Sequence, residues 1–215
     1  MRRSIVVVFL LVAATVGFAQ TAKPVPVTPT ITYLEGSVSV DGKDAAIGDI
    51  VPLGSVVRTG QGAVAEIAFN GRNAVRLAES TTLLFNPGNL QSGSELRQGA
   101  LTLVLKKLVA GAGGESFIVR TPSAVAGVRG TSFFLKVESP ASTYVCACNG
   151  AVSVLGTDGT PLRELASAHH SGLHIEGTGG QPKLTEAGLL YHTDSDLQQV
   201  AADVGVAIDW STIDR

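Results

Sequence analysis

The residues best suited to chemistry in this 215-residue chain gather in one stretch near its C-terminal end, which holds both cysteines and all four histidines. Thiolate and imidazole groups together are the ligands that zinc and mixed-ligand iron–sulfur centres use. Cys146 and Cys148 are two residues apart in a stretch with strand character, so both side chains should point to the same face. We therefore expect zinc or an iron-containing centre to be held by a subset of six residues: Cys146, Cys148, His169, His170, His174 and His192.

The cysteine spacing leaves other interpretations open, because a Cys-x-Cys pair lacks the CxxC of standard zinc signatures. If Val145 and Ala147 point into a core, both thiols face outward, whereas if Tyr144 and the two cysteines point inward, they are small packing residues. A disulfide within the pair would be strained, since same-side strand positions lie near the upper limit of about 6.8 Å for bridged Cα atoms. A disulfide between chains is a further alternative.

The elements that must position these residues are mostly short strands. Residues 117–120, 131–137 and 144–155 are rich in apolar, β-branched and aromatic residues, and we expect the last of these to fold back on itself at Asn149-Gly150. Residues 63–69 alternate, and a turn at 70–73 leads into residues 74–77, which predicts a hairpin. Residues 101–105 are an apolar run typical of a strand buried on both faces.

After residue 155, the pattern predicts a β-hairpin followed by a helix. Residues 162–168 and 173–176 are expected to form its two strands, with His169 and His170 at the tip and His174 on the return strand. Thr193 is a good N-cap, Gly205 a natural stop, and Trp210 a residue that could dock the tail. The helix between them would carry one apolar stripe, formed by Leu197, Val200, Ala201 and Val204.

Composition excludes several function classes. A formal charge of −2 gives no electrostatic case for binding nucleic acid or an anionic membrane surface. No serine lies on a nucleophile elbow, and the carboxylates of Glu66, Glu79, Glu95 and Glu115 are scattered, as expected for solvated faces. The abundant glycine, 25 residues, suits many short strands joined by tight turns. We predict a non-enzymatic, all-β protein, either a twisted β-sandwich or a short β-solenoid, with a short C-terminal helical appendage.

Residues 1–19 have the organisation of a secretory signal peptide. Arg2 and Arg3 precede an apolar core at residues 5–16, which is too short to span a membrane comfortably, and small residues at Gly17 and Ala19 predict cleavage after Ala19. Residues 20–30 are a proline-rich linker. We expect a periplasmic or secreted protein with no membrane span after cleavage. An uncleaved anchor is the alternative, and either would place the body outside the cytoplasm.

An ordered series of motifs in residues 31–155 resembles FecR-type domains. Residues 121–131 (TPSAVAGVRGT) carry the resemblance, together with the close at residues 150–154 (GAVSV) and, upstream, residues 36–40 (GSVSV), 58–60 (RTG) and 99–101 (GAL). The resemblance implies a FecR-like β domain over residues 31–155. It says nothing of residues 156–215, which we expect to be a β-hairpin plus helix appendage.

FecR-type regulators also have a cytoplasmic sigma-factor-binding domain and a transmembrane helix. Only four residues precede the apolar core here, so we expect the extracytoplasmic module alone, without anti-sigma activity. Two hypotheses follow. The first is a non-enzymatic module for protein interaction or signal sensing, with another extracytoplasmic or envelope protein as partner. The second is a metal-binding or thiol-redox protein with its site in residues 146–192. The oligomeric state stays open.

Overall fold

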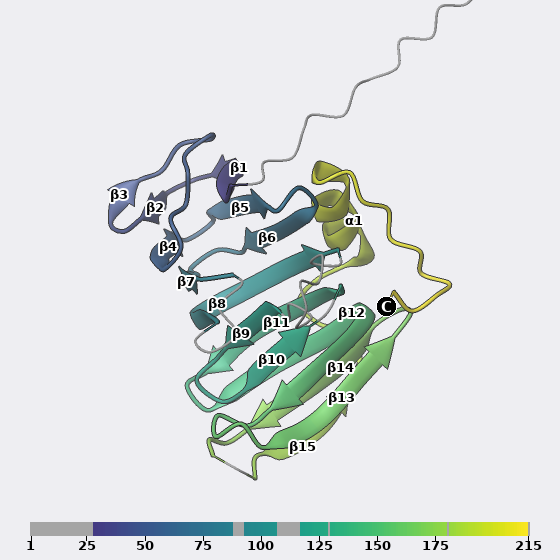
Figure 1. Cartoon of the computed structure of the whole chain (residues 1–215). Helices are drawn as coiled ribbons and strands as arrows, with labels where there is room; N and C mark the ends of the chain where they lie inside the picture. Colours follow the sequence, from purple (N-terminus) through teal and green to yellow (C-terminus); the bar gives the residue numbers. More distant parts are fainter. Residues whose placement is uncertain (1–27, 88–92, 107–116, 129, 180, 215) are drawn as a thin grey trace, which may run out of the picture.

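The structure is a computed structural model that describes residues 28–87, 93–106, 117–128, 130–179 and 181–214 (Figure 1). The predicted signal peptide, most of the predicted linker and Arg129 lie outside the described residues. Over the described ranges the chain forms fifteen strands and one α-helix, which confirms the all-β prediction with its short C-terminal helix. In this part of the chain no helix is long and apolar enough to cross a membrane.

The strands form two layers, here called the first sheet and the second sheet. The first sheet has the order β1 (Thr30–Glu35), β5 (Val64–Phe69), β6 (Asn73–Leu77), β8 (Ser94–Leu105), β11 (Ser132–Ser139), β12 (Ser142–Leu155), β14 (Ser171–Glu176) and β15 (Lys183–Ala187). The second sheet has the order β3 (Lys43–Asp44), β2 (Val38–Val40), β4 (Ser55–Thr59), β7 (Thr82–Phe85), β8, β9 (Phe117–Arg120), β10 (Val125–Val128), β12 and β13 (Pro161–Ser167). Apart from the short parallel pair β8–β9, the pairings of these named strands are antiparallel, so the fold is a sandwich and not a parallel solenoid.

The space between the two sheets is filled by aliphatic and aromatic side chains. Phe69 of the first sheet contacts Phe85 and Phe117 of the second, with ring centroids 5.4 and 5.9 Å apart. Each fully buried side chain of this size contributes about 1.5–3 kcal/mol relative to an exposed one. The predicted hairpin is confirmed as β5–β6, with Asn70 and Gly71 at positive φ in its turn. The predicted buried run at residues 101–105 is confirmed within β8.

Two long strands cross from one sheet to the other at a glycine. In β8 the crossing is at Gly99 (φ 87°), and in β12 it is at Gly150 (φ 125°). A Cβ atom at Gly99 would overlap Thr81, and one at Gly150 would lie 2.7 Å from Thr131 Oγ1. The prediction that residues 144–155 fold back at Asn149-Gly150 is therefore wrong. Glycine is needed there for a positive φ and a close approach, but the strand continues into the second sheet.

Residues after 155 extend both sheets and cover one of them. Strand β13 pairs with the second half of β12, whereas β14 pairs with its first half and β15 forms the edge. The predicted hairpin strands are thus present, although they join different sheets. Helix α1 (Asp194–Asp203) then packs on the outer face of the first sheet, and Gly205 at positive φ follows its end (Figure 1).

Candidate metal centre

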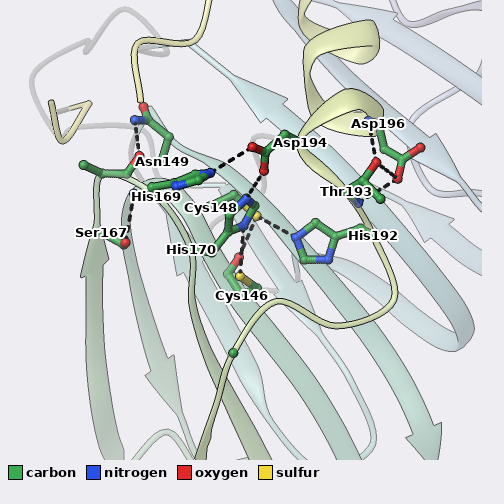
Figure 2. Close-up of polar contacts among 12 residues, drawn as sticks. Cys146, Cys148, Asn149, Ser167, His169, His170, His192, Thr193, Asp194 and Asp196 are labelled. Carbon is green, nitrogen blue, oxygen red and sulfur yellow. Dashed lines mark hydrogen bonds and ion pairs between the residues drawn. The ribbon is translucent and has the colours of Figure 1, made fainter. Parts of the chain in front are cut away.

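Four of the six predicted ligands converge beside the start of α1, and we call them the Cys/His cluster (Figure 2). Cys146 and Cys148 come from β12, His170 from the turn between β13 and β14, and His192 from the position before the N-cap residue Thr193. One ligand atom from each residue lies within 4.8 Å of the others. Three separate segments of the chain therefore bring two thiols and two imidazoles to one point.

The thiols point away from the core between the sheets and are nevertheless fully buried. Val145 and Ala147 belong to the interior, so Cys146 and Cys148 lie on the opposite, outer face of the first sheet. Both are free cysteines with 0% exposure, because α1 and the C-terminal tail cover that face. Of the two directions that the sequence left open, the outward one is found, and the thiols are buried there because α1 and the tail cover them.

Each imidazole of the cluster has one nitrogen directed at a sulfur and the other held by an acceptor. His170 Nδ1 lies 3.6 Å from Cys146 Sγ, and its Nε2 lies 2.6 Å from Asp194 Oδ1. His192 Nε2 lies 3.2 Å from Cys148 Sγ, and its Nδ1 donates to the Leu190 carbonyl at 2.7 Å. A carbonyl or carboxylate oxygen accepts from the far nitrogen, so the near nitrogen of each ring is placed to coordinate a metal ion when it carries no proton. Such outer-shell acceptors orient histidine ligands in metal sites.

The spacing of these atoms fits a small tetrahedral ion. Zn–S bonds of about 2.3 Å and Zn–N bonds of about 2.0–2.1 Å place the ligand atoms of a tetrahedral site about 3.4–3.8 Å from one another. The two sulfur–nitrogen distances, 3.6 and 3.2 Å, are close to that range. Small side-chain rotations would close the cluster around Zn²⁺. Four protein ligands would leave no open position, as in structural and not catalytic zinc sites.

Backbone strain is concentrated at the same place. Among the described residues other than glycine, five have positive φ, and three of these are turn-favouring types: Asp41, Asn70 and Ser80. The other two are His170 (φ 55°) in the cluster and Tyr191 (φ 65°), the residue before His192. Bulky residues adopt this conformation at a cost of the order of 1–3 kcal/mol, and only where surrounding contacts impose it. The fold thus maintains strain at two of the points that position imidazoles.

The electrostatics of the cluster separate the two thiols. The pKa of Cys146 is lowered to about 4, first because the Cys148 thiol acts as a hydrogen-bond donor to it and then because of His192 and His170, which together outweigh burial. The pKa of Cys148 is raised by burial and by the neighbouring Cys146. These opposite shifts favour the form of the pair in which Cys146 is deprotonated and Cys148 keeps its proton. A metal ion would displace the remaining proton, as metal binding to cysteine requires.

The other two predicted ligands lie outside the cluster. His169 is exposed, and its Nε2 lies 2.9 Å from Asp194 Oδ2, so it could join His170 and Asp194 in a second, more exposed group. His174 Nδ1 lies 3.1 Å from Glu138 Oε2 and its ring packs against Tyr144. His174 is thus on the predicted return strand, but it contacts Glu138 and Tyr144 and not the cysteines.

Three residues that the sequence did not mark as part of a site complete the surroundings of the cluster. Asp194, expected only as an acidic residue of the first helical turn, accepts from His170 and has its pKa lowered, first by that hydrogen bond. The Trp210 ring lies over His170 and His169, at centroid distances of 5.4 and 5.0 Å. The Asn149 side-chain amide donates to the carbonyls of Asp209 and Thr212 and so fastens the tail.

Glu66 corrects another expectation, because it is buried instead of lying on a solvated face. It sits on the outer face of the first sheet near α1, and its carboxylate pairs with Arg76 at 3.0 Å. Burial raises its pKa to about 7 against the opposing effect of Arg76. Both faces of β5 are covered, so alternation along the strand could not reveal which face is solvated.

Comparison with known proteins places part of the chain in a family. Residues 55–153 match the family described as FecR protein, inside the region where the motifs resemble that family. No curated protein matches the chain. Two crystal structures of a candidate anti-sigma factor from Parabacteroides distasonis ATCC 8503, at 1.65 and 2.50 Å resolution, are 18% identical over 62% of this chain, with TM-scores of 0.46 and 0.45. The chain spans 60% of the length of those proteins. The part that matches the FecR family includes most of strand β12, which supplies two candidate metal ligands, while the other two come from the segment that follows.

Proposed function

We propose that this protein is a non-enzymatic, exported regulatory module that senses a transition-metal ion, foremost Zn²⁺, through Cys146, Cys148, His170 and His192. The observation that carries the proposal is the convergence of these four ligand atoms within 4.8 Å, with both imidazoles oriented toward the sulfurs by acceptors on their far side. Simple packing of buried cysteines does not require that orientation.

The chemistry of the ligands favours zinc. Thiolates and imidazoles bind Zn²⁺ in closed four-coordinate sites. A Rieske-type iron–sulfur centre also uses two cysteines and two histidines, but it divides them between two irons, whereas the sulfur–nitrogen distances of 3.6 and 3.2 Å here suit ligands of one ion. A bound ion would also protect the thiols from oxidation in the oxidising compartment to which the N-terminal segment, residues 1–19, is predicted to direct the chain.

The regulatory part of the proposal rests on the FecR domain at residues 55–153. Proteins of this family act in signalling and regulation and not in catalysis, which agrees with a closed ligand set. Export rests on the predicted signal peptide. Together they support a module outside the cytoplasm that responds to an ion and contacts an envelope protein.

The first test is the metal content of residues 20–215, purified anaerobically without a histidine tag and reconstituted with zinc. We expect one zinc per chain and its loss when Cys146→Ser and Cys148→Ser are combined. His174→Gln is the matched control and should keep the ion, because His174 lies outside the cluster. Cobalt substitution of the wild-type protein should give thiolate-to-cobalt absorption, so the result does not depend on the folding of the cysteine variant. A wild-type protein with two free thiols and no bound metal after reconstitution would rule the proposal out.

A specific surface favours protein interaction as the accompanying activity. The loop between β3 and β4 exposes Ile47, Ile50 and Leu53 to 63, 62 and 61%, beside the edge strand β1, which Ile50 meets through an isolated bridge at Thr30. Clusters of exposed aliphatic side chains of this kind mark interaction sites. Changing Ile47, Ile50 and Leu53 together to serine should abolish capture of the envelope partner while leaving the zinc content unchanged. If the wild type and the triple serine variant capture the partner equally well, the partner does not bind at this loop.

A further inference from the structure

We propose that the bound metal ion holds the C-terminal segment, residues 192–214, on the outer face of the first sheet. Loss of the ion would then convert this segment from an ordered to a disordered state. The inference rests on the metal centre proposed above. It adds the conformational output through which ion binding would be reported.

The ligands lie on both sides of the boundary between sheet and segment. Cys146, Cys148 and His170 belong to the sheets and their connecting turn, whereas His192 is the first residue of the C-terminal segment. Asp194, in the first turn of α1, holds His170 from the segment side at 2.6 Å. An ion bound to all four ligands would therefore connect the segment to the sheet at the start of α1.

Besides the four ligands, the segment is held by the packing of α1, by the Asn149 amide on the Asp209 and Thr212 carbonyls and by the Lys106–Asp214 ion pair. Helix α1 buries an apolar face of Leu197, Val200, Ala201 and Val204 against the sheet. Arg76 contacts Gln199 at 3.3 Å and Asp203 at 3.2 Å, both at exposed positions where such contacts contribute little. A helix of ten residues is marginal in water without tertiary packing. Once undocked, α1 would lose its helical structure, so release is an order-to-disorder transition.

The connection before the segment is suited to act as a hinge. Tyr191 has a φ of 65° and is held there by its hydroxyl, which donates to Glu138 at 2.7 Å, and by Lys136 over its ring at 4.3 Å. This strained conformation sets the direction in which His192 enters the cluster. Release of His192 would let Tyr191 return to negative φ, which lowers the free energy of the open state.

Release would uncover an apolar surface. Beneath α1 and the tail, the outer face of the first sheet is lined by Ala68, Ala74, Ala100, Val104 and Phe134. The alanines let the helix approach the strands closely, and without the helix this face would lie in water. An ion-dependent change in exposed apolar surface is a signal that a partner protein can recognise.

Hydrogen exchange of residues 20–215 at a buffered series of free zinc concentrations tests the switch. If the open state does not bind zinc, the opening constant for the amides of α1 should fall as free zinc rises. The decrease should be about 100-fold when free zinc is 100 times the dissociation constant of the zinc site. The amides of β5 and β6 serve as an internal reference and should change much less. Trp210 is the only tryptophan of the chain, so its emission should report closure of the tail in parallel.

Two variants separate this inference from the metal centre itself. His192→Ala should leave α1 as weakly protected as in the zinc-free wild type and insensitive to zinc, whereas His174→Gln should behave as wild type. If wild-type protein binds one zinc per chain but α1 protection does not change, the switch is wrong and the metal centre stands. If no zinc binds, the metal centre fails first, as its metal content would already have shown.

Discussion

Strand β12 borders two regions of opposite character. Its residues Val145 and Ala147 face the interior between the sheets, where the apolar cluster consists of Ala, Val, Leu, Ile and Phe side chains. Its residues Cys146 and Cys148 face the outer side of the first sheet, where the cluster under α1 includes both thiols and is bordered by imidazoles. One strand thus serves a purely structural core and a candidate chemical site on alternate residues.

The difference shows what each region is built to do. The interior is held mainly by burial of apolar side chains, and the buried hydroxyls of Thr121 and Ser123 are satisfied by Thr143. The outer region keeps a buried carboxyl group at Glu66, whose pKa is raised by burial, and strained residues at His170 and Tyr191. Groups that reduce stability persist there, which is the pattern expected where a ligand site and not packing determines the residues.

The largest expected loss of stability comes from a substitution at the point where β8 crosses between the two sheets. Gly99→Ala places a Cβ against Thr81 at a positive φ, so the unfolding free energy should fall by about 3 kcal/mol or more. Gly127→Ala is the matched control, because the nearest atom to its Cβ would be the Ser153 carbonyl oxygen at 3.9 Å, and its effect should stay below about 1 kcal/mol. Denaturant titration measures both. Equal losses would show that the crossing of β8 between sheets does not depend on this glycine.

The next effect concerns the carboxylate buried in the outer region. The folded pKa of Glu66, about 7, exceeds its ordinary value of 4.5, so between these values the folded state binds more protons than the unfolded state. The stability that protonation of Glu66 gives is therefore present at pH 4.5 and lost as the pH rises through about 7, by up to about 3 kcal/mol. Glu66→Gln removes this pH-dependent contribution to stability, because the amide does not titrate.

The measurement is the unfolding free energy of wild type and Glu66→Gln from pH 5 to 8. The difference between them isolates Glu66 from other titrating groups, including Cys146, and should shift in favour of the variant as the pH rises. A difference that does not vary with pH would mean that Arg76 keeps the carboxylate ionised throughout, and that the outer region holds a simple ion pair.

Much of the fold follows from the sequence, but the crossing strands do not. The hairpin β5–β6 and the buried run in β8 were predictable from alternation and from one turn. Asn149-Gly150 misled because a hairpin turn and a strand corner both use a glycine at positive φ. The spacing of the interior residues Ala147 and Val152 does not separate the two cases, because residues five apart also share a face across a two-residue hairpin turn.

For the site, the sequence identified the residues but not which of them meet. Residue types alone gathered six candidates. Which histidines meet the cysteines depends on how β14 pairs with β12 and on where α1 lies. Both are set by residues more than 20 positions from the cysteines in the sequence. Trp210 and Asn149 were beyond reach for the same reason, since they meet the site only through the path of the tail.

A smaller effect sharpens the account of the outer region. Asp194→Asn replaces the carboxylate that accepts from His170 Nε2 by a neutral amide, which weakens the preference for a lone pair on Nδ1. We expect zinc affinity to fall by about 10- to 100-fold, the usual cost of losing an outer-shell partner. Asp203→Asn is the matched control on the same helix, because Asp203 contacts Arg76 and not an imidazole. Competition with a zinc chelator gives both affinities, and unchanged binding in the Asp194 variant would remove the carboxylate from the site.

The smallest expected effect, from a substitution at the N-cap of α1, tests whether the outer region and the interior unfold together. Thr193 caps α1 by accepting from the Asp196 amide, while the Asp196 carboxylate accepts from the Thr193 amide. Thr193→Ala should cost about 1 kcal/mol, which is about fivefold in an equilibrium constant. If the C-terminal segment opens on its own, α1 amides should exchange about fivefold faster while the denaturation midpoint stays in place. If the midpoint falls by the full amount and α1 exchange follows it, the outer region and the interior form one cooperative unit, and the ion would then stabilise the whole fold instead of gating one segment of it.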